Sequence, residues 1–439
     1  MRPDKPAPCA ILLCFHFAPS SAVAARRVGA FAQSIAANGL EVLVTSEFGG
    51  SLSRDLPAAL VPIRITESPR PLIDLMVSGK RMLSAPWRRL RGHPDGPRPQ
   101  AETVAALSRR FSDWVIGLLH TIDEHKRWSV RASLATLRAA QGREVRFVLG
   151  SGPPFSTVFA AAWVARRLRV PFVADFRDPL LGGAGIPTAL SNHLQSSMER
   201  RIVVQAHAVC AASPGIAAGL RARYPTHAGK IQVILNGFDG EPAPRLSDTG
   251  HRLNILFAGS LYGSRDPFPF LDAVETMLAA SPVDSARIRI RFIGDCEAYR
   301  GVRLASWAAG KRIGSVLELL PQMPTAGLRD YVEEATVLLN IAQNQPLQIP
   351  AKTFEHLASG REVLAICEPD SDTGRLLAGI AGAWCVDSAA PAAMVAVLAD
   401  LYHRHAVLGM ASAPSLENVR AYSRNIQDEH FRRLLDSVI

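Results

Sequence analysis

The sequence predicts an α/β protein built from two Rossmann-like domains, each a doubly wound parallel sheet covered by helices. Three observations lead to this fold class. The 439 residues exceed the size of one ordinary hydrophobic core, so two domains are expected. The apolar content of 48% is sufficient for sheets that are buried on both faces. Short apolar runs alternate with helical patterns through both halves of the chain, which is typical of parallel strands joined by helices.

The charge balance indicates an anionic partner. The chain has 49 basic and 39 acidic residues, which gives a net charge of +10. It contains no zinc-ligand spacing, RNA-recognition strand or helix-turn-helix signature, and its basic residues are interleaved with apolar ones. We therefore expect nucleotide phosphates or anionic lipid, and no nucleic acid, as the partner.

The cysteines and the apolar runs indicate the compartment. None of the six cysteines forms a CxxC pair, and several fall inside strand-like runs, so we expect buried thiols in a reducing cytoplasm. The first apolar run is short and leads to His16 and Pro19 rather than to a cleavage site, so no signal peptide is expected. No run reaches the roughly 18 apolar residues of a membrane-spanning helix. We expect a cytoplasmic protein that is soluble or peripheral on the inner face of the membrane.

The first half opens with a strand, loop, helix and second strand at residues 10–15, 16–21, 24–38 and 41–45. The loop lies at the carboxyl edge of the predicted sheet, where such folds bind ligands. His16, Arg26 and Arg27 are therefore candidates for ligand contacts. An ordinary structural hydrogen bond accounts for His16 equally well.

Residues 68–110 differ from the rest of this half. They contain six prolines, and nine basic residues stand against three acidic ones. Leucines, methionines and Trp87 are mixed with this charge, which is typical of an interfacial helix or a mobile lid. We expect this insertion either to lie on an anionic membrane surface or to be a solvated loop.

Regular structure then resumes toward a second candidate edge. The patterns predict helices at 103–121, 130–140 and 157–168, strands at 145–149, 172–174, 203–212 and 231–235, and a linker at 241–251. Asp175, Arg177 and Asp178 follow one of these strands. Two carboxylates around an arginine at a carboxyl end are plausible as a catalytic rim, and a structural salt bridge that fixes the loop is the alternative.

The second half repeats the alternation. Strands are predicted at 254–258, 288–293, 316–319, 337–341, 363–367 and 383–386, and helices at 267–279, 301–309, 326–334, 352–359, 373–378, 390–402 and within 415–439. We expect domains at 1–243 and 250–414, with 415–439 as a closing helical segment.

One loop and helix in this half carries a cation and a carboxylate together. Pro350 precedes the helix, Gly360 ends it, and Lys352 and Glu355 share a face because they are three residues apart. A helix N-terminus with Lys352 attracts phosphate, and Glu355 is placed to accept bonds from ribose hydroxyls. A surface ion pair between the two side chains is the alternative.

Three segments together resemble the retaining glycosyltransferases of family 4, which have the GT-B fold of two Rossmann-like domains facing across a cleft. These segments are VADFRDP at 173–179, FAGSLY at 257–262 and IPAKTFEHLASG at 349–360. The resemblance covers most of the chain in the same order, with gaps. It implies that the closing helix returns to the first domain.

The resemblance also implies roles in the second domain. Glu355 matches the glutamate that contacts the donor ribose, Gly259 and Ser260 let the backbone approach the donor, and Arg265 neutralises the diphosphate, with Lys352 as the second cation. The family's first glutamate falls on Leu347, a departure from the pattern. Amides surround this position and have the chemistry to bind sugar hydroxyls: Gln343, Asn344, Gln345 and Gln348.

The resulting prediction is a glycosyltransferase that moves a sugar from a nucleotide-diphosphate sugar to a saccharide or lipid-linked acceptor in cell-surface polysaccharide synthesis, with retention. Asp178, Arg177 and His16 are the candidate catalytic residues. We expect no metal and no cofactor, because cations and helix N-termini stabilise the leaving diphosphate. A sugar-nucleotide epimerase of the same fold and a catalytically silent nucleotide-binding module are the alternatives.

Overall fold

The computed structural model describes residues 7–20, 23–47, 57–66, 123–181, 189–244, 246, 248–280, 283–412 and 414–439. The chain forms two compact units. Unit 1 consists of residues 1–212, 216–234 and 428–439, and unit 2 consists of 213–215 and 235–427. Within the described ranges, no helix is both long and apolar enough to cross a membrane. The basic insertion predicted at 68–110 and the helix predicted at 103–121 lie outside these ranges.

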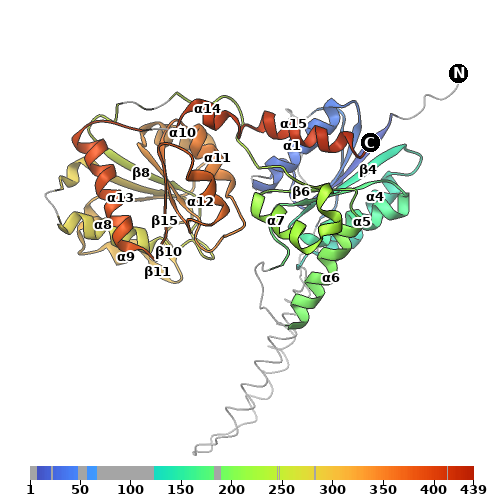
Figure 1. The fold of residues 1–439 in the computed structure, drawn as a ribbon, viewed down its shortest axis with the longest axis horizontal. Coiled ribbons are helices and arrows are strands. Elements are labelled where there is room, and N and C mark those ends of the chain that lie inside the picture. Colours follow the sequence, from blue (N-terminus) through green and yellow to red (C-terminus); the bar gives the residue numbers. More distant parts are fainter. Residues whose placement is uncertain are drawn as a thin grey trace, which may run out of the picture. The chain divides into compact units, whose positions relative to one another are not determined.

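Unit 1 is organised around a seven-stranded parallel sheet with the order β3-β2-β1-β4-β5-β6-β7 (Figure 1). Its strands are β1 Cys9–Leu13, β2 Glu41–Ser46, β3 Leu60–Arg64, β4 Val145–Gly152, β5 Phe172–Phe176, β6 Ala208–Ala211 and β7 Ile231–Val233. The strand order reverses between β1 and β4, which is the point where parallel sheets open toward a ligand. The edge strand β3 tolerates Pro62 because proline needs no ladder partner on the outer side.

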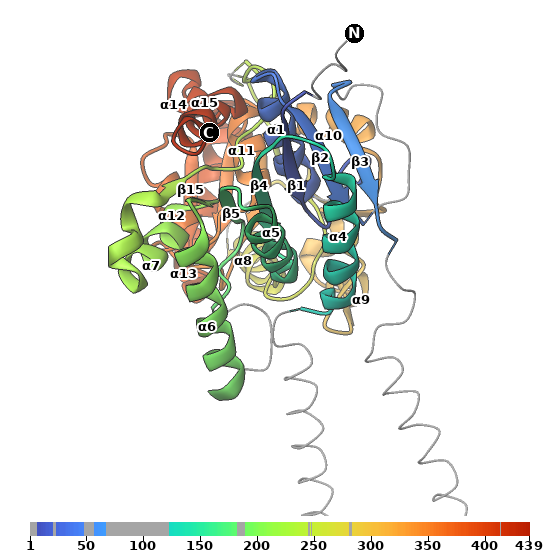
Figure 2. The same cartoon turned by 90° about the vertical axis from the view of Figure 1, so that its right-hand side faces the viewer.

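Helices cover both faces of this sheet. They are α1 Val23–Ala37, α4 Lys126–Ala139, α5 Phe155–Leu168, α6 Ala189–Gln205, α7 Pro214–Arg223 and α15 Arg424–Asp436. On one face, Phe31 of α1 stacks on Phe431 of α15, with ring centroids 4.0 Å apart. Figure 2 shows α4 and α5 side by side on the other face. A Cβ on Gly150 would lie 2.5 Å from that of Ala161, so this glycine lets α5 pack closely on β4.

The strand predicted at 203–212 is wrong in its first half. Helix α6 continues to Gln205, and the strand covers only β6. The apolar, β-branched run that includes Val203 has the composition of a strand. Here it forms the last turn of a helix, in which Ile202 and Val203 are buried and Val204 is 44% exposed.

Unit 2 contains a six-stranded parallel sheet with the order β12-β9-β8-β13-β14-β15. Its strands are β8 Leu253–Ala258, β9 Ile288–Ile293, β12 Leu317–Leu320, β13 Val337–Ile341, β14 Glu362–Ile366 and β15 Ala383–Val386. The order reverses between β8 and β13. Each half of the chain therefore has the doubly wound parallel sheet that the sequence predicts.

Core residues alternate between the two faces of this sheet. Ile255 and Phe257 pack with α8 and α13, whereas Leu256 packs with α10. The helices are α8 Phe268–Ala280, α9 Leu304–Ala308, α10 Thr325–Glu334, α11 Ala351–Ala358, α12 Asp372–Leu377, α13 Pro391–Tyr402 and α14 Leu416–Arg420, with 3-10 turns at Pro225–Lys230 in unit 1 and at Ser285–Arg287 and Arg312–Ser315 in unit 2. The helix predicted at 301–309 is shorter, because β10 Ala298–Tyr299 and β11 Val302–Arg303 form a hairpin there, and Arg300 and Gly301 take positive φ in its turn.

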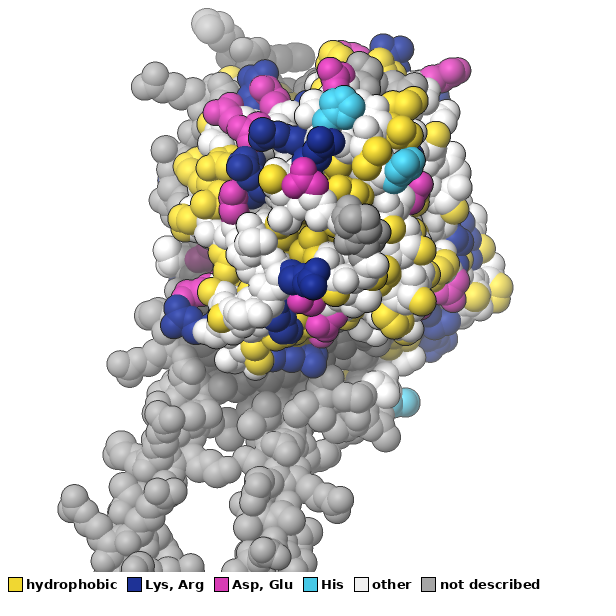
Figure 3. All heavy atoms as spheres, turned by 90° about the vertical axis from the view of Figure 1, so that its left-hand side faces the viewer, with side chains coloured by type: hydrophobic (Ala, Val, Ile, Leu, Met, Phe, Trp, Pro, Cys, Tyr) yellow, Lys and Arg dark blue, Asp and Glu magenta, His cyan; other side chains and the backbone are white. Residues whose placement is uncertain are grey.

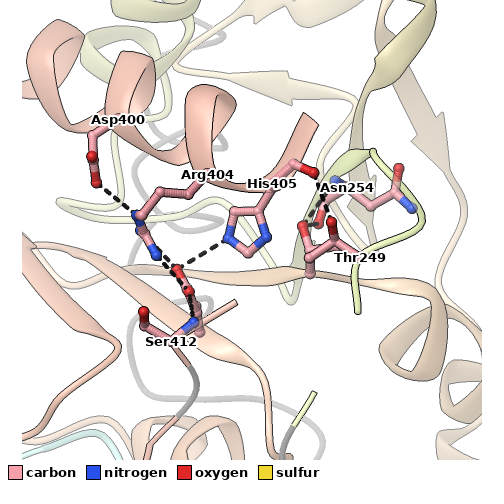
Figure 4. Close-up of polar contacts among 8 residues, drawn as sticks. Thr249, Asn254, Asp400, Arg404, His405 and Ser412 are labelled. Carbon is pink, nitrogen blue, oxygen red and sulfur yellow. Dashed lines mark hydrogen bonds and ion pairs between the residues drawn. The ribbon is translucent and has the colours of Figure 1, made fainter. Parts of the chain in front are cut away.

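A buried charge cluster fixes the amino edge of the same sheet (Figure 4). Glu362, the first residue of β14, accepts hydrogen bonds from Arg404 Nη1 at 2.7 Å and Nη2 at 3.0 Å and from the Ser412 amide. His405 Nε2 lies 3.1 Å from the second Glu362 oxygen. Arg404 and His405 belong to a π-helical turn, His403–Val407, that follows α13. Burial raises the pKa of Glu362, but the bonds from His405 and Arg404 outweigh it and hold the pKa below its ordinary value.

Candidate functional site

The candidate site of unit 2 lies at the carboxyl edge of its sheet. Loops leave this edge after β8, β9, β13 and β14, and the strand order reverses between β8 and β13. Ligands of doubly wound sheets bind at such a reversal. Helix α11 begins just after the β13 loop, with Pro350 in extended backbone ahead of its first turn and Gly360 in the left-handed region after its end.

Lys352 reaches from α11 to the end of β8. Its Nζ donates a hydrogen bond to the Ala258 carbonyl at 3.2 Å and lies 4.6 Å from the centroid of the Phe257 ring. A Cβ on Gly259 would lie 2.6 Å from this Nζ, so a larger residue there would displace the ammonium group. Gly259 therefore makes room for the cation as well as for a close backbone approach.

Lys352 is buried next to a second cation. Burial, together with the positive charge of Arg265, lowers the pKa of Lys352 to about 8. The Arg265 guanidinium stacks on Tyr262 at 4.4 Å, and its buried Nε has no hydrogen-bond partner in the part of the chain that the structure describes. Two cations that lie next to each other at this edge are suited to an anion with more than one charge.

Gln343 holds the loop that carries Arg265. Its side-chain carbonyl accepts a bond from the Asp266 amide at 3.0 Å, and its side-chain NH₂ donates to the Asp266 carbonyl at 2.9 Å. Ser264 Oγ donates to the Gln343 carbonyl at 2.8 Å. The Gln343 side chain is buried, and its amide group is already bonded to Asp266. The expectation that this amide binds sugar hydroxyls is therefore wrong. Gln343 positions the Arg265 loop instead.

The loop after β14 contributes a carboxylate that the sequence analysis did not single out. Glu368 Oε1 accepts a hydrogen bond from the Asn344 amide at 2.8 Å. Its buried Oε2 has no partner among the described residues. Asn344 takes φ 56°, a left-handed conformation that asparagine tolerates. Glu368 directly follows the buried strand predicted at 363–367. This position is the sequence signal that identifies Glu368 as a residue of this edge.

Glu355 and His356, both on α11, have different surroundings. Glu355 is exposed, and its negative charge lies close enough to Lys352 to favour the charged form of the lysine. His356 is buried, and burial and the neighbouring Lys352 lower its pKa to about 3, so it stays neutral. Gln348 and Ser260 are half-buried at the same edge, and the Gln348 carbonyl accepts a bond from Thr373 at 3.0 Å.

In unit 1, Asp175 and Arg27 form a buried ion pair. Arg27 Nη2 donates to Asp175 Oδ1 at 2.7 Å, and Ser151 Oγ donates to Oδ2 at 2.7 Å. Arg27 Nη1 also donates to the Ile234 carbonyl at 2.7 Å. Both side chains are at most 2% exposed. The structural alternative therefore holds for Asp175, and Arg27 ties α1 to the sheet rather than contacting a ligand.

The other predicted residues of unit 1 lie together at its carboxyl edge. His16, Arg177 and Asp178 are all half-buried. Burial lowers the pKa of Arg177 although Asp175 and Asp178 oppose this, and its buried Nε has no partner among the described residues. Burial and then Arg177 lower the pKa of His16, so its imidazole is neutral near pH 7. This edge offers a neutral base beside a cation.

Within the described ranges, no cluster of three or more histidine, cysteine, aspartate or glutamate residues is arranged to hold a metal ion.

Comparisons with known proteins agree with this architecture. The model of Glycosyltransferase Family 4 matches residues 90–241. No curated protein sequence matches the chain. The structure of Anabaena HepE in complex with UDP and glucose is similar at a TM-score of 0.58 and 12% identity, with 98% of this chain and 100% of that chain covered. The chain has the GT-B fold.

Two further solved structures share the GT-B fold over nearly their whole length. The lipopolysaccharide outer core galactosyltransferase WaaB matches at a TM-score of 0.58 and 10% identity, covering 98% of this chain and 100% of that one. The E. coli trehalose-6-phosphate structure bound with UDP-2-fluoro glucose matches at a TM-score of 0.60 and 14% identity. The match covers 99% of this chain and 100% of that one.

Proposed function

We propose that this protein is a glycosyltransferase that uses a nucleotide-diphosphate sugar as donor. The observation that carries the proposal is the pair of desolvated cations, Lys352 and Arg265, at the strand reversal of unit 2. A donor diphosphate supplies negative charge to both cations. The family model and the GT-B fold support the same reaction class, and HepE in its solved complexes holds UDP and UDP-glucose.

The leaving group determines what unit 2 contributes to the reaction. Cleavage of the sugar–phosphate bond leaves negative charge on the diphosphate, and preorganised cations stabilise it most in the transition state. We assign this role to Lys352, Arg265 and the first amides of α11, which together act without a metal ion. Glu355 holds the ribose hydroxyls, and Gly259 and Ser260 let the backbone approach the donor. Gln348 lies at the same edge and is assigned to the sugar.

The acceptor side is assigned to unit 1. A neutral His16 has the chemistry to accept the proton of an acceptor hydroxyl, and Arg177 and Asp178 orient the reacting groups beside it. Retention of configuration and an acceptor in cell-surface polysaccharide synthesis complete the proposal, supported by the match to family 4.

A cationic surface on unit 1 supports a peripheral position on the inner face of the membrane, next to a lipid-linked acceptor. Helices α4 and α5 contain six basic residues and no acidic one. Apolar side chains stand among them at high exposure: Val130 is 61%, Leu134 46% and Trp163 42% exposed. By contrast, Figure 3 shows a face of unit 2 on which basic and acidic side chains are interspersed. The α4–α5 surface thus has the charge and the apolar groups that an anionic bilayer attracts.

Calorimetric titration with UDP, GDP and ADP, and with their monophosphates, tests the donor site. Lys352→Met should weaken diphosphate binding more than monophosphate binding. Glu355→Ala should weaken both by roughly one to two powers of ten, because a charge-assisted bond contributes about 1.5 to 3 kcal/mol. Arg329→Ala, at an 80% exposed position, is the matched control and should bind normally. Wild-type affinity in a folded Glu355→Ala protein would contradict the site.

Product analysis separates the reaction classes. A transferase releases nucleoside diphosphate when acceptor is present and only slowly by hydrolysis without it. An epimerase changes the free nucleotide sugar, and a silent binding module does neither.

Vesicle binding tests the membrane assignment. The protein should sediment with phosphatidylglycerol vesicles and not with phosphatidylcholine, and salt should release it, since each basic residue contributes about 1 kcal/mol near an anionic surface. Arg127→Glu with Arg138→Glu should weaken this binding, whereas the control pair Arg303→Glu with Arg329→Glu should not. Equal binding by both double variants would refute the α4–α5 surface as the contact.

A further inference from the structure

Two cysteines of unit 2 are in direct contact. Cys367 follows the last residue of β14, and Cys385 lies in the neighbouring parallel strand β15. Their Sγ atoms are 3.1 Å apart, and Cys385 Sγ is 3.3 Å from the Cys367 carbonyl. A disulfide needs an S–S separation of about 2.05 Å, so the two sulfurs have to approach by roughly 1 Å. The adjacent, hydrogen-bonded strands β14 and β15 hold the two cysteines close enough for this approach.

The remaining cysteines have other surroundings. All four are buried as free thiols, and Cys14 and Cys296 direct their Sγ atoms to the carbonyls of Thr45 and Gly259. Burial raises the pKa of Cys14 to about 12 and that of Cys296 to about 12, which makes both unreactive. Cys385 is partly exposed, and the Cys367 thiol donates a hydrogen bond that lowers its pKa. Cys385 is thus the accessible thiol of a close pair.

We propose that Cys367 and Cys385 form a reversible disulfide that regulates the nucleotide site. A low-molecular-weight disulfide is the oxidant. The Cys385 thiolate attacks one of its sulfurs and releases the first small thiol. Cys367 loses its proton and attacks the Cys385 sulfur of the mixed disulfide, which releases the second small thiol. The protein loses two protons and two electrons, and the oxidant gains them.

The position of the pair gives the direction of the effect. Glu368 directly follows Cys367 and holds the Asn344 amide in the loop after β13. Strand β14 lies between β13 and β15, so a bond from Cys367 to β15 draws the start of the Glu368 loop away from Asn344. Oxidation should therefore loosen the β13 loop that leads to Lys352. This consequence rests on the proposed nucleotide site, whereas formation of the disulfide does not.

The test begins with the full-length protein and oxidised glutathione. Intact mass should show the loss of two hydrogen atoms, and peptide mapping should join Cys367 to Cys385. Cys385→Ser should abolish the cross-link, and the matched control Cys296→Ser should retain it. A stable glutathione adduct on Cys385, or no reaction at either cysteine, would overturn the proposal.

The second measurement is the affinity for UDP before and after oxidation. The oxidised wild type should bind about tenfold more weakly, the loss expected for one charge-assisted bond, and dithiothreitol should restore the affinity. Cys385→Ser should bind equally under both conditions. Unchanged affinity in the cross-linked protein would refute the regulatory role. A reduced protein that forms the disulfide on oxidation but never binds a nucleotide would refute the proposed function and leave the disulfide standing.

Discussion

Two groups of buried charge lie at opposite edges of the unit 2 sheet, and they differ in how the charge is balanced. At the amino edge, Glu362 is completely buried and receives bonds from Arg404 and Ser412, with His405 beside it. At the carboxyl edge, Lys352 and Arg265 face each other's charge, and the bond of Lys352 goes to a neutral carbonyl. We call the first cluster complete, because its carboxylate is bonded to groups of the protein. We call the second incomplete, because two cations are neighbours there and the buried Arg265 Nε has no partner among the described residues. This difference separates a structural cluster from the site that we propose for an anion.

Removing the carboxylate of the complete cluster should have the largest effect. Glu362→Gln leaves the Arg404 charge in a site built for an ion pair, and breaking such a pair costs about 3 to 5 kcal/mol. Denaturant titration should record this loss in the free energy of unfolding. The folded fraction should keep its affinity for UDP, because the cluster lies at the other edge of the sheet. A small loss of stability would mean that the Glu362 ion pair contributes no more than an ordinary surface pair does.

Removing the cation of the incomplete cluster should act in the opposite direction on stability. The pKa of Lys352 is about 8 in the folded protein, below its ordinary 10.5, so folding disfavours the charged form. Near pH 7, Lys352→Met should therefore raise the free energy of unfolding without ligand by on the order of 1 to 3 kcal/mol, while UDP affinity falls. Chemical denaturation with and without UDP measures both quantities. If the variant is destabilised and binds normally, Lys352 belongs to the scaffold.

The same pKa predicts how nucleotide affinity depends on pH. A bound diphosphate favours protonated Lys352, so affinity should be constant below about pH 8 and decrease above it, by at most about tenfold per pH unit. Lys352→Arg stays protonated in this range and should give a flat profile between pH 7.5 and roughly 9.5. If the affinities of the wild type and of Lys352→Arg change with pH in the same way, the titrating group is not Lys352.

The smallest predicted effect concerns two buried histidines of unit 2, which differ in the charge beside them. His405 lies beside a carboxylate and His356 beside a cation. Because the pKa of His356 is about 3 when folded and 6.5 ordinarily, the unfolded chain binds an extra proton below pH 6.5, and stability is lost as pH falls toward 3. His356→Asn should remove this contribution and reduce the loss between pH 6.5 and 5.5 by about 1 kcal/mol. Unfolding curves at pH 6.5 and 5.5 measure this loss for both proteins. An equal loss of stability in the wild type and in His356→Asn would contradict the prediction.

The regular elements of the fold follow from local patterns in the sequence. The strands predicted at 288–293, 337–341 and 383–386 have these same bounds in the structure. The edge strand β3 was not predicted, since Pro62 interrupts its pattern. The α6–β6 boundary was misplaced because an apolar, β-branched run satisfies a helix and a strand equally.

The site is less visible in the sequence because it depends on contacts between distant loops. Spacing and resemblance identified Lys352 and Arg265, which the structure brings together. The clamp of Gln343 on Asp266 joins residues 77 positions apart, and local periodicity carries no record of it. The Glu368 bond to Asn344 is likewise a tertiary contact. Arg27 and Asp175 form an ion pair although they lie 148 positions apart in the sequence. Both were candidates for the ligand site, and both have a structural role instead.

The packing of α15 has a consequence for how the protein is made. Phe431, Leu434 and Leu435 are fully buried in the core of unit 1, which otherwise ends at residue 234. Synthesis of the roughly 200 intervening residues, at about 5 to 20 residues per second, takes on the order of 10 to 40 s. The unit that leaves the ribosome first is therefore the last to complete its core. During that interval the surface around Phe31 lacks its native cover, and a chain terminated anywhere before residue 431 never acquires it.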